Sequence, residues 1–171
     1  MDRKKECIEI YKEAFGEEDA EFREKLFDIC FDDCIYIEID GSAAAMFFAL
    51  PCEINAGQKL PAVYIYAVAT RKDLRSKGYM TQLLKDYISK CGRIIFLRPA
   101  NVSLTEFYGR IGFKKITAVN SNTGIPRVIP AGCFSELTEN MSEGDGKEFT
   151  LMYYSKNPQN IDNLKFIYSM E

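Results

Sequence analysis

The stretch LPAVYIYAVATRKDLRSKGYM, residues 60–80, decides the fold of this chain. Its first part, Leu60 to Thr70, is rich in Val, Tyr and Ile and is apolar on both faces, which predicts a buried central strand. The basic segment that follows carries Gly78, where a helix is expected to begin. A strand, a basic loop and a helix N-terminus in this order suit a pyrophosphate, because the helix start presents unpaired N–H groups and a positive dipole end.

The segments around this stretch predict a mixed sheet with helices on its faces. Two amphipathic helices and a hairpin with its turn at Asp40-Gly41 come first, at residues 3–15, 18–32, 34–39 and 43–52. After the stretch we expect alternating helices and strands, at residues 80–91, 93–97, 102–111, 114–119 and 148–155. We expect Gly92 and Gly112 to end the two helices. Residues 120–147 are long for a connection, with a short strand at 127–129 and a helical turn near 135–140, and residues 156–171 stay ambiguous.

Composition limits the kinds of chemistry that the chain can perform. A length of 171 residues predicts one domain over residues 1–171. The chain contains no histidine, which excludes Ser-His-Asp and Cys-His catalysis and histidine metal sites. Six cysteines without a CxxC pair predict reduced, buried thiols and no metal site. The net charge of −3, the absence of a long apolar run and the polar N-terminus predict a cytoplasmic protein that binds neither nucleic acid nor membrane.

A second motif follows the basic loop by about thirty residues. Phe107-Tyr108-x-x-x-Gly112-Phe113 places a tyrosine on a helix that a glycine ends, and Asn101 is suited to cap the start of that helix. The basic loop alone favours a solvated turn, and it matches neither GxxxxGK[ST] nor GxGxxG. Together the two motifs resemble the GNAT superfamily of N-acyltransferases. There, a Val-x-Val strand precedes an Arg/Gln-x-x-Gly-x-Gly/Ala loop, and a later helix closes on Tyr-x-x-x-Gly-Phe.

The resemblance implies an α/β fold of the α+β type: a GNAT-like mixed, mostly antiparallel twisted sheet with helices on both faces. It also implies backbone contacts from one strand to the pantetheine arm of acetyl-CoA and from the following loop to the pyrophosphate. The strand residues are Val68, Ala69 and Thr70, and the loop residues are Arg75, Ser76, Lys77, Gly78, Tyr79 and Met80. Met80 departs from the family's Gly or Ala. Asn101 would contact the pantetheine or only cap its helix, and Tyr108 would be the general acid for the leaving thiolate, with packing under the sheet as the alternative.

The expected activity is an N-acetyltransferase that moves an acetyl group from acetyl-CoA to a primary amine of a small molecule or peptide, without a metal. A noncatalytic acyl-CoA sensor and a structural domain with a vestigial loop are the alternatives. The general base stays open, with Glu38 and Glu53 as candidates, and Tyr64 and Tyr66 either line the acceptor pocket or pack in the sheet. The acidic run from Glu17 to Asp33 suits a cationic acceptor or is only the solvent-exposed face of a helix. A homodimer also stays open.

Overall fold

The computed structural model describes residues 2–17, 19–139, 144–157 and 166–169. Contacts divide the chain into two compact units, of which the first holds Met1–Ala49 and Ile65–Cys91 and the second holds Leu50–Tyr64 and Gly92–Glu171. Two long strands, β2 (Ser42–Asn55) and β3 (Lys59–Thr70), contribute to both units. The single domain expected over residues 1–171 stays a prediction.

The first unit begins with two helices and a hairpin. Helix α1 (Arg3–Phe15) is capped by Asp2 and ends at Gly16, and α2 (Ala20–Cys30) is capped by Asp19 and followed by a 3₁₀ turn, η1 (Phe31–Asp33). Strand β1 (Cys34–Ile39) pairs antiparallel with β2. Between them Asp40 and Gly41 have φ values of 51° and 77°, the left-handed conformation that a two-residue hairpin turn requires. A second 3₁₀ turn, η2 (Lys72–Leu74), and helix α3 (Tyr79–Lys90) complete the unit.

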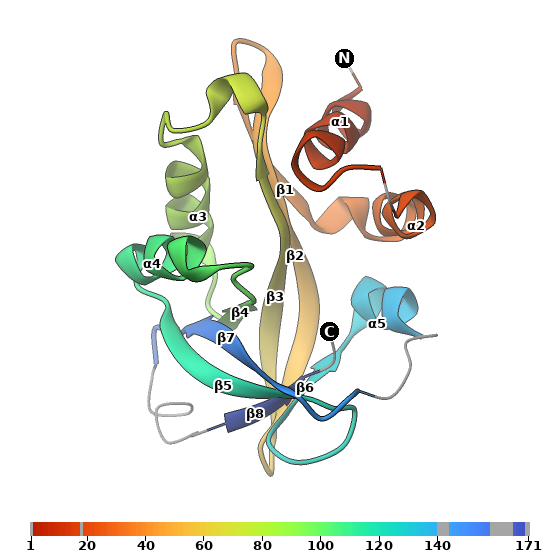
Figure 1. The fold of residues 1–171 in the computed structure, drawn as a ribbon, viewed down its shortest axis with the longest axis vertical. Coiled ribbons are helices and arrows are strands. Elements are labelled where there is room, and N and C mark those ends of the chain that lie inside the picture. Colours follow the sequence, from red (N-terminus) through yellow and green to blue (C-terminus); the bar gives the residue numbers. More distant parts are fainter. Residues whose placement is uncertain (1, 18, 140–143, 158–165, 170–171) are drawn as a thin grey trace. The chain divides into compact units, whose positions relative to one another are not determined.

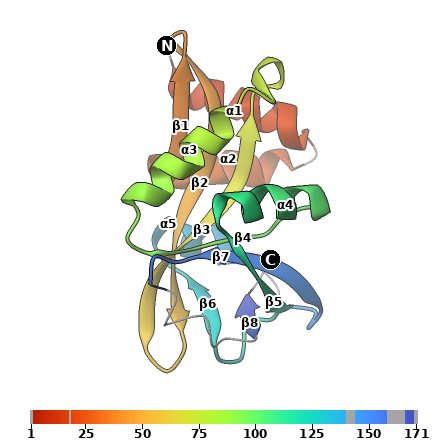
Figure 2. The ribbon, with the colours of Figure 1, turned by 90° about the vertical axis from the view of Figure 1, so that its left-hand side faces the viewer.

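Helices cover both faces of the strands in the first unit. Phe48 of β2 meets Phe27 of α2 with ring centroids 5.0 Å apart, whereas its neighbour Phe47 meets Tyr87 of α3 at 5.4 Å. Successive side chains of a strand point to opposite faces, so α2 and α3 lie on opposite sides of β2. Figures 1 and 2 show the same arrangement, with α1 and α2 together on one side and α3 on the other. The expected helices on both faces are therefore confirmed.

The second unit is built mainly of strands. Its elements are β4 (Ile94–Leu97), α4 (Val102–Ile111), β5 (Lys114–Asn120), β6 (Arg127–Pro130), α5 (Gly132–Thr138), β7 (Glu148–Tyr154) and β8 (Phe166–Ser169). Strand β7 lies antiparallel between β4 and β5, whereas β8 runs parallel to both β5 and β6. Strand β6 also pairs antiparallel with the end of β2, at Cys52–Asn55, so this sheet closes on itself.

In the part of the chain that the structure describes, the sheet has eight strands in the order β1-β2-β3-β4-β7-β5-β8-β6, and most of the strand pairs with a known register are antiparallel. The predicted mixed, mostly antiparallel sheet is confirmed. Strand β3 lies between β2 and β4, and residues 62–65 are buried, as the central strand was expected to be. Its position follows from its lack of a polar face.

The prediction that Gly92 ends the third helix is wrong. Helix α3 ends at Lys90 and its C-cap is Cys91, whose backbone N–H donates to the Tyr87 carbonyl at 2.8 Å. Cys91 has extended backbone with φ −74° and ψ 121°, so this helix end needs no left-handed residue and gains nothing from glycine. The helix predicted at residues 18–32 spans only Ala20–Cys30 in the structure, and the residues after it form the 3₁₀ turn η1. Asn140, at the end of the predicted helical turn, lies outside the described residues.

Within the described residues, no helix is both long enough and apolar enough to cross a membrane.

Candidate functional site

The loop between η2 and α3 has the backbone of an anion-binding turn. Ser76 and Gly78 both have positive φ, at 63° and 85°, and Gly78 is the N-cap of α3. No side chain caps this helix and its first turn holds no acidic residue. The first N–H groups of α3 therefore have no intrahelical acceptor, and no fixed negative charge competes for them. Successive amides in alternating conformations around a left-handed residue form a concave nest for an anion.

Some of the positively charged side chains of this loop are in ion pairs, and others are free to bind a ligand. Arg71 binds Asp73 through two hydrogen bonds of 2.7 and 3.1 Å, so its charge is matched within the loop. Arg75 donates from Nε to the Thr70 carbonyl at 3.1 Å, which ties the loop back to the end of β3. Neither Arg75 nor Lys77 forms an ion pair with the part of the chain that the structure describes, and both are exposed. These two cations are therefore available to a polyanion.

Strand β3 contains a feature that the sequence did not reveal. Ala67 has φ 53° in the middle of the strand, and its side chain is 8% exposed. The left-handed conformation costs a residue with a Cβ about 1–2 kcal/mol, and it changes the direction of the adjoining peptide groups. Strained backbone of this kind gathers at functional sites. Glycine or asparagine would have signalled such a position, and alanine in an apolar run gives no such signal.

The structure places nine of the predicted cofactor-binding residues together in the first unit. Val68, Ala69 and Thr70 form the last residues of β3, directly after the left-handed Ala67. Residues 75–78 form the exposed loop, and Tyr79 and Met80 open α3 with partly exposed side chains. The left-handed residue, the strand end and the loop thus follow one another along fourteen residues of chain, from Ala67 to Met80.

The remaining two predicted site residues, Asn101 and Tyr108, lie on helix α4 of the second unit. The Asn101 side chain accepts a hydrogen bond from the Leu104 N–H at 2.9 Å, so the expected cap is present. Gly112 ends the helix in the left-handed conformation with φ 110°. A Cβ at this position would lie 3.3 Å from the Tyr154 ring. Glycine is therefore favoured both by the left-handed backbone and by the close approach of Tyr154.

Tyr108 is an aromatic residue of the core of its unit, and it is 4% exposed. Its ring packs edge-on against Phe107 and Phe113, with centroids 5.1 and 5.9 Å away. Burial raises the pKa of the Tyr108 hydroxyl to about 12. At neutral pH this hydroxyl keeps its proton, so it can act as a donor and not as a base.

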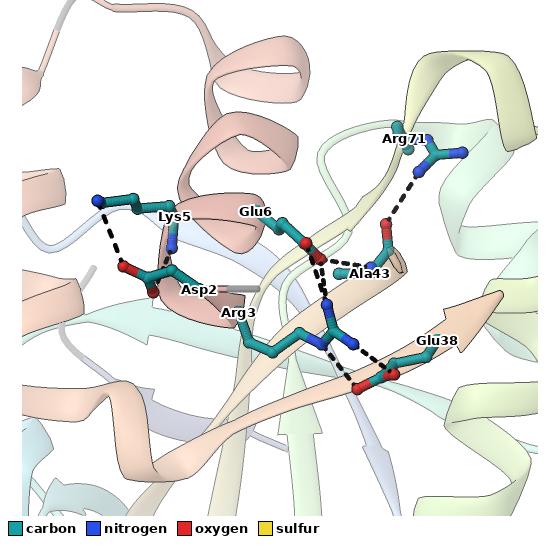
Figure 3. Close-up of polar contacts among 7 residues, drawn as sticks. All are labelled: Asp2, Arg3, Lys5, Glu6, Glu38, Ala43 and Arg71. Atoms are coloured by element: carbon teal, nitrogen blue, oxygen red, sulfur yellow. Dashed lines mark hydrogen bonds and ion pairs between the residues drawn. The ribbon is translucent and has the colours of Figure 1, made fainter. Parts of the chain in front are cut away.

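The two carboxylates considered as general bases are both engaged in ion pairs. Glu38 accepts two hydrogen bonds from Arg3, at 2.8 and 2.7 Å, in a network that also joins Glu6 to the Ala43 N–H (Figure 3). The hydrogen bonds from Arg3 lower the pKa of Glu38, which makes it a weaker base. Glu53 pairs with Lys59 at 3.1 Å across the β2–β3 hairpin. Both positions have a structural role.

The two tyrosines of β3 have different surroundings. Tyr64 packs against Phe134 of α5 in the second unit, with ring centroids 5.7 Å apart. Tyr66 belongs to the first unit, where it meets Phe22 of α2 at 6.0 Å and shares a side-chain hydrogen bond with Tyr11 of α1. Tyr64 and Tyr66, which the sequence placed on one face of the strand, therefore contact different parts of the chain.

Metal-ligating residues do not gather anywhere in the described ranges: no group of three or more Cys, Asp or Glu side chains there could hold a metal ion. All six cysteines are present as thiols, and four of them are buried, namely Cys7, Cys30, Cys34 and Cys52.

Comparison with known proteins identifies the family. The family model for the acetyltransferase (GNAT) domain matches residues 2–116, which is more than half of the chain. This range includes both motifs and every predicted site residue. A search of curated proteins finds no match.

Solved structures show the same fold at low identity. A GNAT family N-acetyltransferase (YhbS) from Escherichia coli, solved in complex with CoA, aligns with a TM-score of 0.64 and 14% identity over 99% of this chain and 84% of that one. A probable N-acyltransferase from Enterococcus faecalis aligns with a TM-score of 0.62 and 19% identity, over 90% of this chain and 50% of that one.

A GCN5-related N-acetyltransferase from Kribbella flavida aligns with a TM-score of 0.54 and 14% identity, over 67% of this chain. Our chain thus spans only a third to a half of the length of two of these structures, 33% of the Kribbella protein and 50% of the Enterococcus protein. With its two motifs, its fold and the family match over residues 2–116, the chain belongs to the GNAT acetyltransferase family.

Proposed function

We propose that this chain transfers an acetyl group from acetyl-CoA to a primary amine. The observation that carries the proposal is the loop at residues 75–80, where left-handed residues at Ser76 and Gly78 lead into an uncapped helix start. The amides of Ser76 to Met80 would bind the pyrophosphate of CoA, with Arg75 and Lys77 supplying positive charge. The complex of the YhbS protein with CoA supports a CoA-derived cosubstrate in this fold.

The pantetheine arm would lie along Val68, Ala69 and Thr70 and pair with their backbone groups as an added strand. With the phosphates at residues 76–80, the sulfur end of the arm points back along β3 toward Ala67. The left-handed backbone at Ala67 redirects the adjoining peptide groups, and such groups are suited to polarise the thioester carbonyl.

The reaction is a direct displacement. The amine nitrogen attacks the thioester carbonyl carbon, the N–C bond forms and the C–S bond breaks. The nitrogen gives up a proton to solvent, and the CoA thiolate takes a proton from the Tyr108 hydroxyl, which solvent then restores. An amine with a pKa like that of lysine must first lose its extra proton, at a cost of roughly 4–5 kcal/mol at pH 7. Tyr108 carries its proton at neutral pH, and its role as general acid, which depends on its position and not on its acidity, is part of the proposal.

Release of CoA thiol from acetyl-CoA across a panel of amines tests the activity, and calorimetry with CoA tests binding. Tyr108→Phe is expected to lower kcat by about 10²- to 10⁴-fold, the usual contribution of a general acid, and to leave the Kd for CoA unchanged. Phe107→Leu, which changes a neighbouring ring without removing a hydroxyl, is the matched control.

The alternatives predict different results. A noncatalytic acyl-CoA sensor would bind CoA and release no thiol with any amine. A structural domain with a vestigial loop would show no heat with CoA and no thermal shift, and either result would end the proposal of an enzyme.

A further inference from the structure

The proposed reaction needs a binding site for the acceptor amine, and no residue has yet been assigned to it. The first unit contains a cluster of aromatic side chains that suits this role. Tyr66 lies on β3 immediately before the left-handed Ala67, two residues from the strand end proposed for the pantetheine arm. Because the thioester end of that arm points back along β3, the side chains around Tyr66 are the next groups that it meets. The inference therefore depends on the proposed function for its location.

Aromatic rings from three elements meet around Tyr66. Phe22 of α2 stands edge-on to the Tyr66 ring at 6.0 Å, and Tyr11 of α1 shares a side-chain hydrogen bond with Tyr66. Tyr11 also contacts Phe15, with ring centroids 4.7 Å apart, and Phe15 is 49% exposed. Tyr66 and Phe22 are partly exposed as well. We call Tyr11, Phe15, Phe22 and Tyr66 the aromatic cluster. It offers an apolar ligand several ring surfaces that reach solvent.

A carboxylate lies beside Phe22 of this cluster. Asp19 caps α2 by accepting from the Phe22 N–H at 3.2 Å, which holds it at the side of Phe22. Burial raises the pKa of both tyrosines, and the negative charge of Asp19 raises each of them further, whereas the positive charge of Arg23 lowers the pKa of Tyr11. The charge of Asp19 is therefore felt at both hydroxyls.

The other charges nearby are already paired. Arg23 is buried and binds Glu17 at 2.9 Å, and Lys12 pairs with Glu9 at 3.1 Å and with Glu17 at 3.6 Å. Asp19 forms no ion pair with any other described residue. An unmatched carboxylate beside aromatic faces and hydroxyl groups is the environment that a protonated amine prefers, because ring faces, hydroxyl oxygens and carboxylate all attract an ammonium ion.

We propose that Asp19, Tyr66 and the aromatic cluster bind the acceptor, and that the acceptor is a primary amine on a flat apolar body, such as an arylalkylamine. Asp19 and the Tyr66 hydroxyl hold the ammonium group, and Phe22 and Phe15 contact the apolar body. Tyr11 positions Tyr66 through their shared hydrogen bond. The acidic side chains farther along α2, such as the exposed Glu24, take no part.

Three small molecules test separately the contributions of the aromatic ring and of the ammonium group to binding. 2-Phenylethylamine has both ring and ammonium, butylamine has only the ammonium, and 2-phenylethanol has only the ring. Binding of each probe to the CoA-loaded protein is measured by calorimetry, and the KM of the two amines is measured by thiol release. We expect 2-phenylethylamine to bind at least about tenfold more tightly than either of the other two, a difference of about 1.4 kcal/mol.

Substitutions assign the effect to residues. Asp19→Asn keeps the helix cap, since asparagine caps as well as aspartate, so the fold is retained while the charge is lost. We expect Asp19→Asn to weaken the binding of both amines about tenfold and to leave the binding of 2-phenylethanol unchanged. Phe22→Leu is expected to weaken 2-phenylethylamine and to leave butylamine unchanged. Glu24→Gln, the same chemical change on the same helix, is the matched control and is expected to change neither.

The results distinguish this inference from the proposed function. Equal effects of Asp19→Asn and Glu24→Gln on amine binding, or equal affinity for butylamine and 2-phenylethylamine, would overturn the acceptor assignment even if acetyl-CoA binds. Absence of CoA binding with intact amine discrimination would overturn the proposed transferase and retain the amine site. In that case the amine measurements are made on the protein without CoA.

Discussion

Replacing Gly78 with alanine separates the cost of backbone strain from the cost of lost ligand contact. Gly78 has φ 85° and ψ −1°, and no protein atom lies within 4 Å of the position that a Cβ would take. Within the protein, the substitution is therefore opposed by the left-handed backbone and not by a clash. In the proposed complex the same Cβ would point into the space of the pyrophosphate.

The two costs have different sizes. A left-handed alanine costs about 1 kcal/mol of folding free energy, and for a chain of this length that lowers Tm by about 2–4 °C. A displaced phosphate loses one or two hydrogen bonds to charged oxygens, each contributing about 1.5–3 kcal/mol. The affinity for CoA is therefore expected to fall by at least about 10- to 100-fold.

Gly57 supplies the matched control. It has φ 90°, and it too has no atom within 4 Å of a Cβ, but it precedes β3 whereas Gly78 follows it. Gly57→Ala is expected to lower Tm by a similar amount and to leave the Kd for CoA unchanged. Scanning calorimetry gives Tm, and titration calorimetry gives the Kd. If Gly78→Ala and Gly57→Ala change the Kd for CoA equally, backbone contact between the loop and the pyrophosphate is refuted.

Three further predictions follow from the same geometry. Because burial raises the pKa of Tyr108 to about 12 from an unfolded value near 10, the folded state binds more protons between these two values, so the free energy of unfolding falls as pH rises through this window. Urea unfolding at pH 9 and pH 11.5 should show a fall that is roughly 2 kcal/mol smaller in Tyr108→Phe, and equal falls would contradict the shift. Asn101→Ala should lower Tm by about 2–4 °C through loss of the cap on Leu104, whereas Asn101→Asp should keep Tm. Weaker CoA binding by Asn101→Asp would assign the amide to the pantetheine, and unchanged binding would limit Asn101 to capping. Arg75→Ala and Lys77→Ala should each weaken CoA binding about tenfold at low salt and much less at 1 M salt, whereas Lys90→Ala, at the other end of α3, should have no effect. A salt-independent loss would argue against a contact with phosphate.

The order of elements and the two motifs could be predicted from the sequence, because both depend on local chemistry. The bounds of α1 and α4 follow from their caps at Asp2 and Asn101 and from the glycines that end them. The central place of β3 follows from its lack of a polar face, since only a strand covered on both sides is stable with that composition. The helix end at Gly92 was mispredicted because glycine permits a left-handed cap without requiring one.

Only the tertiary structure decided which distant side chains meet. Glu38 was a candidate base in the sequence, and its pairing with Arg3 on α1 depends on the packing of that helix against the hairpin. The left-handed alanine at Ala67 and the contacts of Tyr66 with Phe22 and Tyr11 are also products of packing, because no local pattern specifies them. Local sequence determines backbone conformation over a few residues, so it indicated the proposed phosphate loop. The proposed acceptor site draws on α1, α2 and β3, so it depends on how those elements fold together.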